Sequence, residues 1–296
     1  MLFQTSGKIG SNLYLLTFGR ACFYVIEELS GRLSLVDTGP PIFYPFLKKR
    51  LTSLGIAPSS LSRVYLTSDT YERVGALALL LTDHPRIEIA SNDQILHSLS
   101  SYSLVESYCS QEKILGTLYP KLTPPRPLAE PLDLLMNRSS CLTLDKAEAH
   151  ELSHRECSEV VSALYFPREG CIVAGKCLGF FRGNNLPAPR CSAPFVSTRD
   201  FLESFKDISF RNLAMPFDGV LSGALAMKHI RELSQTLHDV ESEVAGALAD
   251  GRSELEIQGF VEDQIFSDDS NDPFYRQALR HALSVTTTRL FPHYTK

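Results

Sequence analysis

Short apolar runs alternate with polar turns and helical patterns through the first ninety residues of the chain. Residues 33–36 and 63–66 are apolar and partly β-branched, which predicts two buried strands. Residues 43–54 after the first strand, and 74–81 after the second, carry apolar side chains at helical spacing. This order predicts a layered α/β fold, in which the loops at the carboxyl ends of the strands hold the functional residues.

The same alternation continues on both sides of this region. We predict an antiparallel pair of strands before it and four strands after it, at 11–16, 22–26, 86–90, 141–144, 160–166 and 171–176. A last strand is expected near 212–215 and a short helix at 200–205. Residues 178–194 are rich in Gly, Pro and Asn, which predicts a loop.

Two segments stand apart from the strand pattern. Prolines are dense in the second half of residues 98–138, which predicts a surface insertion without regular structure. Residues 223–249 form an amphipathic helical pattern that ends at Gly251, and Ser253 with Glu256 makes a capping box for a further helix. We therefore divide the chain into a domain at 1–225, which contains the insertion, and a C-terminal helical extension at 226–296 packed on it.

The composition of the chain argues against several classes of partner and location. A net charge of −5 and a pI near 5.9 provide no basic field, so nucleic acid is not an expected partner. The sequence has no apolar run of the ~18–20 residues that span a bilayer, so no membrane association is expected. The seven cysteines form no C-x-x-C pair and the N-terminus lacks a signal-peptide pattern, which predicts reduced thiols in a cytoplasmic protein.

The two strands at 33–36 and 63–66 end in distinctive polar segments. The first is followed by Asp37-Thr38-Gly39, and the second by Thr67-Ser-Asp-Thr-Tyr-Glu-Arg-Val-Gly75. This arrangement resembles the metallo-β-lactamase superfamily, where a strand ending in Asp-Thr-Gly precedes a strand ending in Thr-His-x-His-x-Asp-His-x-Gly. The resemblance implies an αββα four-layer sandwich of two mixed sheets. Thr67 and Gly75 match the frame, whereas the four ligand positions hold Ser68, Thr70, Glu72 and Arg73.

The resemblance assigns four more positions to the same site. His154 stands where the superfamily has a ligand histidine, Lys176 where it has an aspartate that bridges two metals, and Asp218 where it has the last histidine. Asp37 matches a residue that supports the site without binding the metal. Active superfamily members use zinc or iron to hydrolyse thioesters, lactams, phosphoesters or nucleic acids, or to handle oxygen.

The residue types at these positions suit a metal poorly. Serine and threonine are weak zinc ligands, and an arginine is not deprotonated in a protein. The cations of Arg73 and Lys176 would repel a dication in a partly buried cleft. We therefore expect no metal and no other cofactor. Arg73 and Lys176 would instead replace the charge of the metals, balanced by Glu72, Asp218 and Asp37 in a salt-bridge cluster.

These expectations lead to three hypotheses about function. The first is a pseudoenzyme: a non-catalytic binding, regulatory or scaffold protein whose insertion and C-terminal helices contact a protein partner or a second copy of the chain. The second is a hydrolase of esters, thioesters or phosphoesters, with an atypical or mononuclear zinc or iron site at His154, Asp218 and Glu72. The third is a sensor that binds a small anionic ligand through Arg73 and Lys176.

Overall fold

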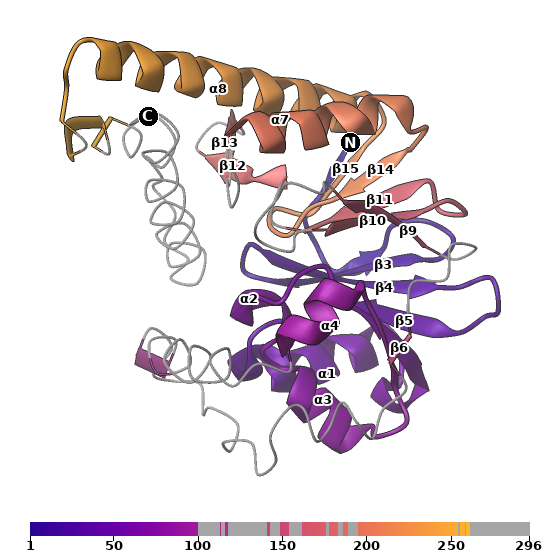
Figure 1. Cartoon of the computed structure of the whole chain (residues 1–296). Coiled ribbons are helices and arrows are strands. Elements are labelled where there is room, and N and C mark those ends of the chain that lie inside the picture. The colour runs from indigo at the N-terminus through magenta and orange to yellow at the C-terminus, as the bar shows by residue number, and fades with distance from the viewer. Residues whose placement is uncertain are drawn as a thin grey trace.

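The structure is a computed structural model, and it describes residues 1–99, 113, 116–117, 141–142, 149–153, 162–175, 178–182, 186–188, 195–253, 255–257 and 259–260. The described residues form four layers (Figure 1). Helices α7 (Phe195–Ser204) and α8 (Ala224–Ala249) cover one sheet, and the other sheet is covered by α1 (Tyr44–Ser53), α3 (Leu77–Asp83) and α4 (Asp93–Leu99). The two sheets therefore face each other in the middle. This arrangement confirms the predicted αββα sandwich.

The first sheet contains the strands of the N-terminal region. Neighbours are antiparallel from β2 to β5 and parallel from β5 to β8, so the sheet is mixed as predicted. Strand β5 has the predicted bounds, and β6 lies within two residues of its prediction. In spatial order the strands are β2 (Gly7–Lys8), β3 (Leu13–Phe18), β4 (Ala21–Glu27), β5 (Leu33–Val36), β6 (Leu61–Tyr65), β7 (Glu88–Ala90) and β8 (Cys141–Leu142).

The second sheet combines the later strands with the first one. Strands β10 and β11 form the predicted hairpin, and β11 pairs in parallel with β14. In spatial order the strands are β1 (Leu2–Phe3), β15 (Val220–Ser222), β14 (Asn212–Ala214), β11 (Cys171–Ala174), β10 (Ser162–Phe166) and β9 (His150–Ser153). A separate hairpin of β12 (Phe180–Arg182) and β13 (Leu186–Ala188) lies inside the segment predicted as a loop. That prediction was wrong, because two short runs flank Gly183-Asn-Asn, which is a hairpin signal.

Two helix predictions need correction. The helix expected at 74–81 is split into α2 (Tyr71–Val74) and α3 (Leu77–Asp83), because the amide of Ala76 donates to Gly39 O at 2.7 Å instead of continuing the helical ladder. The helix expected at 200–205 begins earlier, as α7 (Phe195–Ser204), directly after a proline in the sequence. A 3₁₀ turn, η5 (Phe205–Asp207), follows it.

Helices α1 and α8 agree with their predictions within one residue at each end. Helix α1 is followed by Gly55 at φ +76°, the left-handed conformation of a glycine helix stop. The predicted capping box is present, because Ser253 N and Oγ both donate to Glu256 Oε2, at 2.8 and 2.7 Å. None of the described helices is long and apolar enough to cross a membrane. The bounds are η1 (Pro41–Phe43), α1 (Tyr44–Ser53), η2 (Pro58–Ser60), α4 (Asp93–Leu99) and α8 (Ala224–Ala249).

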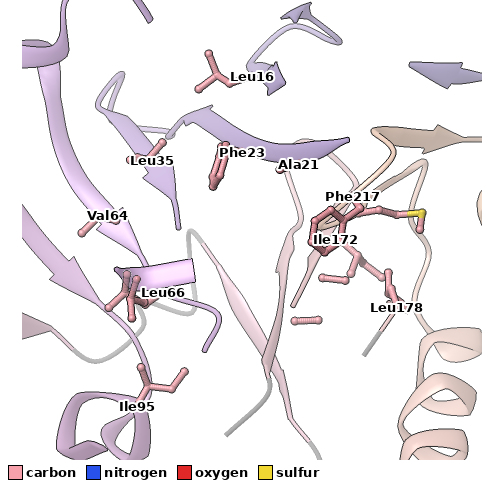
Figure 2. Close-up of a cluster of buried hydrophobic side chains, with 14 of the residues drawn as sticks. Leu16, Ala21, Phe23, Leu35, Val64, Leu66, Ile95, Ile172, Leu178 and Phe217 are labelled. Atoms are coloured by element: carbon pink, nitrogen blue, oxygen red, sulfur yellow. The ribbon is translucent and has the colours of Figure 1, made fainter. Parts of the chain in front are cut away.

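Apolar side chains alternate between two cores along each strand. Leu35 of β5 and Ile172 of β11 belong to the larger cluster, which includes the residues under the helices. Figure 2 shows part of this cluster, with side chains from both sheets. Their strand neighbours Val36 and Val173 belong to a smaller cluster of strand residues from both sheets, which is the layer between the sheets. This two-residue period fixes the register of both sheets.

Between the sheets, a buried polar network occupies the end of the first sheet where its parallel strands begin. Glu28, which is 1% exposed, accepts hydrogen bonds from Arg63 Nη1 at 3.1 Å and from Tyr65 OH at 3.0 Å. Arg32 contacts the second oxygen of the same carboxylate, and Arg63 also binds Glu88 at 2.8 Å. Because each of these charges faces an opposite charge within the network, we interpret it as a stabilising cluster and not as a ligand site.

A buried histidine attaches α8 to the segment between β11 and β12. His229 is 2% exposed, and its Nε2 lies 3.0 Å from the carbonyl oxygen of Leu178. Burial lowers the pKa of His229 to about 4, despite the opposing effects of the hydrogen bond and of Glu232. The imidazole is therefore neutral at pH 7, and α8 is held by a neutral hydrogen bond in the core.

This pKa predicts that His229 makes the fold less stable in acid. The pKa of the folded state lies below the ordinary value of 6.5, so the stabilisation is complete above pH 6.5 and is lost as the pH falls toward 4. The shift corresponds to about 3 kcal/mol at its limit. Urea unfolding between pH 7.5 and 4.5 should show a steep loss in the wild type and a shallower one in His229→Gln.

His238 is the matched control for this experiment, since it lies on the same helix with an exposed side chain. His238→Gln should follow the wild-type pH profile. Parallel profiles for the wild type and His229→Gln would contradict the assignment.

Candidate functional site

The site begins where β5 and β6 end side by side. Asp37 directly follows β5, and Thr67 lies two residues beyond the end of β6. The Asp37 carboxylate accepts hydrogen bonds from Thr67 N at 2.9 Å and from Thr67 Oγ1 at 2.8 Å. Asp37 has φ +59°, in the left-handed region that an aspartate tolerates better than most residues. The first strand of the motif thereby presents a fully buried carboxylate to the loop after the second strand.

Thr67 also reaches the opposite sheet. Its carbonyl oxygen accepts hydrogen bonds from Ser162 N at 3.1 Å and Ser162 Oγ at 3.2 Å, and Gly175 N donates to Ser162 O at 3.3 Å. A Cβ atom on Gly175 would lie 2.7 Å from Ser162 O, so this position excludes a side chain. Asp37, Thr67, Ser162 and Gly175 form a continuous hydrogen-bonded connection between the two sheets. We call it the Thr67 junction.

In the loop after Thr67, short polar side chains form hydrogen bonds within the loop. Ser68 Oγ and Thr70 Oγ1 lie 2.9 Å apart, and Thr70 N donates to Ser68 Oγ at 3.3 Å. Helix α2 then carries Glu72 and Arg73, both buried, at 7% and 4% exposure. Ser68 and Thr70, which stand at two ligand positions of the resemblance, are thus hydrogen-bonded to each other.

Arg73 holds the Asp-Thr-Gly loop in two ways. Its carbonyl oxygen accepts hydrogen bonds from Thr38 N at 2.7 Å and Gly39 N at 2.9 Å. Its guanidinium lies between the sheets: Nη1 is 3.9 Å from Asp37 Oδ2, and Cζ is 5.6 Å from the centre of the Phe217 ring. Arg73 and Asp37 therefore form a buried ion pair beside the Thr67 junction.

Asp218 forms an ion pair with an arginine from the opposite sheet. Arg20 Nε donates to Asp218 Oδ1 at 2.6 Å, and Asp218 N donates back to Arg20 O at 2.8 Å. Arg20 lies in the turn between β3 and β4, whereas Asp218 lies between β14 and β15, so the pair crosses the two sheets. The sequence analysis gave Arg20 no role. In the sequence, Arg20 is a charged residue beside Gly19 in a tight turn, and this pattern does not predict which loop the side chain contacts.

Burial controls the protonation of the groups around these pairs. It raises the pKa of Asp37 above its ordinary value, although Arg73 and the two Thr67 hydrogen bonds favour the carboxylate. Burial, aided by the charge of Asp218, raises the pKa of the Cys22 thiol to about 12. Cys22 therefore stays protonated at pH 7, which disfavours a role as a nucleophile.

The structure places six of the eight predicted site residues. Asp37 and Arg73 face each other, Ser68 and Thr70 are bonded together, Glu72 precedes Arg73 on α2, and Asp218 pairs with Arg20. His154 and Lys176 lie outside the described residues. Within the described part of the chain, no three or more His, Cys, Asp and Glu side chains are placed to hold a metal ion.

Several solved structures share this architecture along most of the chain. A metallo-β-lactamase family protein from Thermus thermophilus has a TM-score of 0.61 at 17% identity, covering 95% of this chain and 94% of its own. A metallo-β-lactamase superfamily protein from Sulfolobus tokodaii has a TM-score of 0.56 at 15% identity, covering 94% of this chain and 98% of its own. The chain has the metallo-β-lactamase fold.

More distant enzymes with the metallo-β-lactamase fold also match. The subclass B3 metallo-β-lactamase BJP-1 of Bradyrhizobium japonicum has a TM-score of 0.53 at 13% identity, covering 84% of this chain and 96% of its own. No protein-family model and no curated protein matches the sequence. The fold predicted from the Asp-Thr-Gly and Thr67–Gly75 segments is therefore confirmed, whereas the identities are too low to transfer an activity.

The described residues do not fit the metal of this fold. Of the ligand positions in the loop after β6, two carry hydroxyls bonded to each other and one carries a guanidinium, which has no lone pair to donate. Asp218, at the position of the last ligand, is bound to Arg20. The positive charge of Arg20, 2.6 Å from this carboxylate, would repel a metal ion bound there.

The contact of Arg73 with Asp37 can be tested by a double-mutant cycle. Arg73→Met keeps the apolar stem beside Phe217 but removes the charge facing a buried carboxylate, so we expect a loss of about 2–4 kcal/mol in the free energy of unfolding. In Asp37→Asn, the amide can still accept from Thr67 N and donate to Thr67 Oγ1. The double variant should lose clearly less than the sum of the two single variants in denaturant unfolding.

Asparagine is the appropriate replacement because it tolerates the positive φ of Asp37. Additive losses within about 0.3 kcal/mol would show that the two charges are not coupled across their 3.9 Å separation.

Proposed function

We propose that this chain is a metal-independent, non-catalytic protein that uses the metallo-β-lactamase fold for binding, regulation or scaffolding. The observation that supports this most strongly is Arg73, which occupies a ligand position with its guanidinium directed at Asp37. Two unit charges 4 Å apart interact by about 4 kcal/mol near a protein surface, and a dication doubles that repulsion. A permanent cation at this position therefore opposes a metal ion beside it.

The hydrogen bonding of the remaining positions supports the same proposal. Hydrolysis in this fold requires a metal-bound water that is ionised near neutral pH. Ser68, Thr70 and Asp218 are engaged with protein groups, and the buried Cys22 thiol stays protonated. These residues offer neither a free ligand set nor an activated nucleophile, so the proposed protein works without zinc, iron or another cofactor.

The proposed activity is the binding of a protein partner or of a second copy of the chain. The sequence suggests the insertion at 98–138 and the helices of the C-terminal extension as the contact surfaces, because loops and added helices vary most on a constant scaffold.

Elemental analysis of the purified, untagged protein tests the proposal. Zinc, iron and manganese should each stay below about a tenth of an equivalent, before and after reconstitution with each metal. None of the three metals should raise the melting temperature, because a ligand stabilises a fold only when it binds the native state. One or two equivalents that are lost in His154→Ala or Asp218→Asn would instead support the hydrolase hypothesis, and esters, thioesters and phosphoesters would then be screened.

A matched variant shows whether the loop itself prevents metal binding. Ser68→His, Thr70→His, Glu72→Asp and Arg73→His together restore the superfamily ligands in the loop after β6. This variant should bind more zinc than the wild type in the same assay. Equal and substantial zinc in both proteins would show that Arg73 does not exclude the metal, which would overturn the proposal.

A further inference from the structure

A second junction joins the two sheets, at the turn that contains Arg20. Strand β3 ends at Phe18 and β4 begins at Ala21, and the turn between them lies against the loop between β14 and β15. Cys22 N donates to Pro216 O at 3.1 Å, Asp218 N donates to Arg20 O at 2.8 Å, and Ala21 forms an isolated bridge with Phe217. Main-chain hydrogen bonds therefore connect strands that belong to different sheets.

Tyr24 strengthens this junction from inside the core. Its hydroxyl lies 2.6 Å from Met215 O and 3.0 Å from Gly219 O, the two carbonyls at the ends of the loop that holds Asp218. Met215 N in turn donates to Gly219 O at 3.0 Å. The loop is therefore closed upon itself and fixed to β4, and Arg20 contacts it at its tip.

The backbone of Asp218 is held in an unfavourable conformation. Among the described residues, Asp37 and Asp218 are the two non-glycine residues with positive φ, at +59° and +70°. Such conformations persist where the surrounding structure holds them. The Asp218 carboxylate is 4% exposed and the Arg20 side chain 25% exposed, so the pair closes the edge of the sandwich with one partner buried and the other reaching solvent.

We propose that the Arg20–Asp218 pair is a conformational lock between the two sheets, and that its release opens the β14–β15 loop without unfolding the protein. The Thr67 junction connects the sheets through other main-chain hydrogen bonds, since it uses Ser162 of β10 and Gly175 directly after β11. Opening at Arg20 therefore leaves that connection in place. While the ion pair is intact, Asp218 and Phe217 stay packed against the core. When the pair breaks, the loop can move outward, so the pair controls the access of a partner to this edge of the site.

Native-state hydrogen exchange tests the lock at the backbone amides that form its hydrogen bonds. Cys22 N and Asp218 N donate the two main-chain hydrogen bonds across the junction, so their exchange rates report its opening. Arg20→Gln and Asp218→Asn should each accelerate exchange at both amides by about tenfold or more, and Arg20→Lys should accelerate it less. The double variant should exchange no faster than the faster single variant, because either change removes the same charge–charge interaction.

Two controls distinguish a lock from general destabilisation. The amide of Ser162, which donates to Thr67 O, should keep its wild-type exchange rate in every variant. Lys48→Gln breaks an ion pair of similar length, 2.8 Å to Asp83, in which both side chains are about two-fifths exposed, and it should leave Cys22 and Asp218 unaffected. Asparagine keeps the tolerance of position 218 for positive φ, so Asp218→Asn isolates the charge.

Three results would overturn the proposal. The first is exchange in the double variant that equals the product of the two single effects. The second is an equal acceleration at Ser162, which would indicate global or shared opening. The third is wild-type exchange at Cys22 and Asp218 in both single variants, which would show that the main-chain bonds and Tyr24 hold the junction without the ion pair.

Discussion

The hydrogen bonds of Thr67 are the contact on which the rest of the site depends. One residue binds the Asp37 carboxylate through its amide and hydroxyl, and binds Ser162 of the opposite sheet through its carbonyl. In a sandwich, two sheets otherwise meet through apolar side chains, which have no directional preference. Thr67 supplies that direction. It fixes the carboxyl ends of β5 and β6 against β10, and so sets where the loop from Ser68 to Arg73 begins.

Near this junction, each of two buried carboxylates is paired with an arginine of the same chain. Asp37 faces Arg73 and Asp218 faces Arg20, and each arginine approaches its carboxylate from a different element of the fold. A buried carboxylate without an opposite charge would shift its pKa upward or destabilise the fold. In a metal enzyme of this fold, a cation from solution balances the carboxylates. Here side chains of the chain itself supply the positive charge.

The sequence predicts those parts of the fold and the site in which local signals and tertiary structure agree. Residues 33–36 are apolar, partly β-branched and bounded by turns, and β5 has those bounds. The motif segments that follow locate Asp37 and Arg73, because their spacing is preserved. They do not locate Arg20, which is 198 positions from Asp218 in the chain. Only the packing of two turns from different sheets brings that pair together, so contacts between the sheets require the folded structure.

The proposed metal-independent function can be related to the chemistry of arginine. A metal-bound carboxylate changes state with metal concentration and pH, since ligands must be deprotonated and the ion can dissociate. Arginine keeps its charge at every pH at which the fold is stable. The positive charges of Arg73 and Arg20 therefore stay in place under conditions that would empty a zinc site. A fixed positive charge does not ionise a water molecule, but it agrees with the proposed binding role, in which the protein presents the same surface whatever the metal supply.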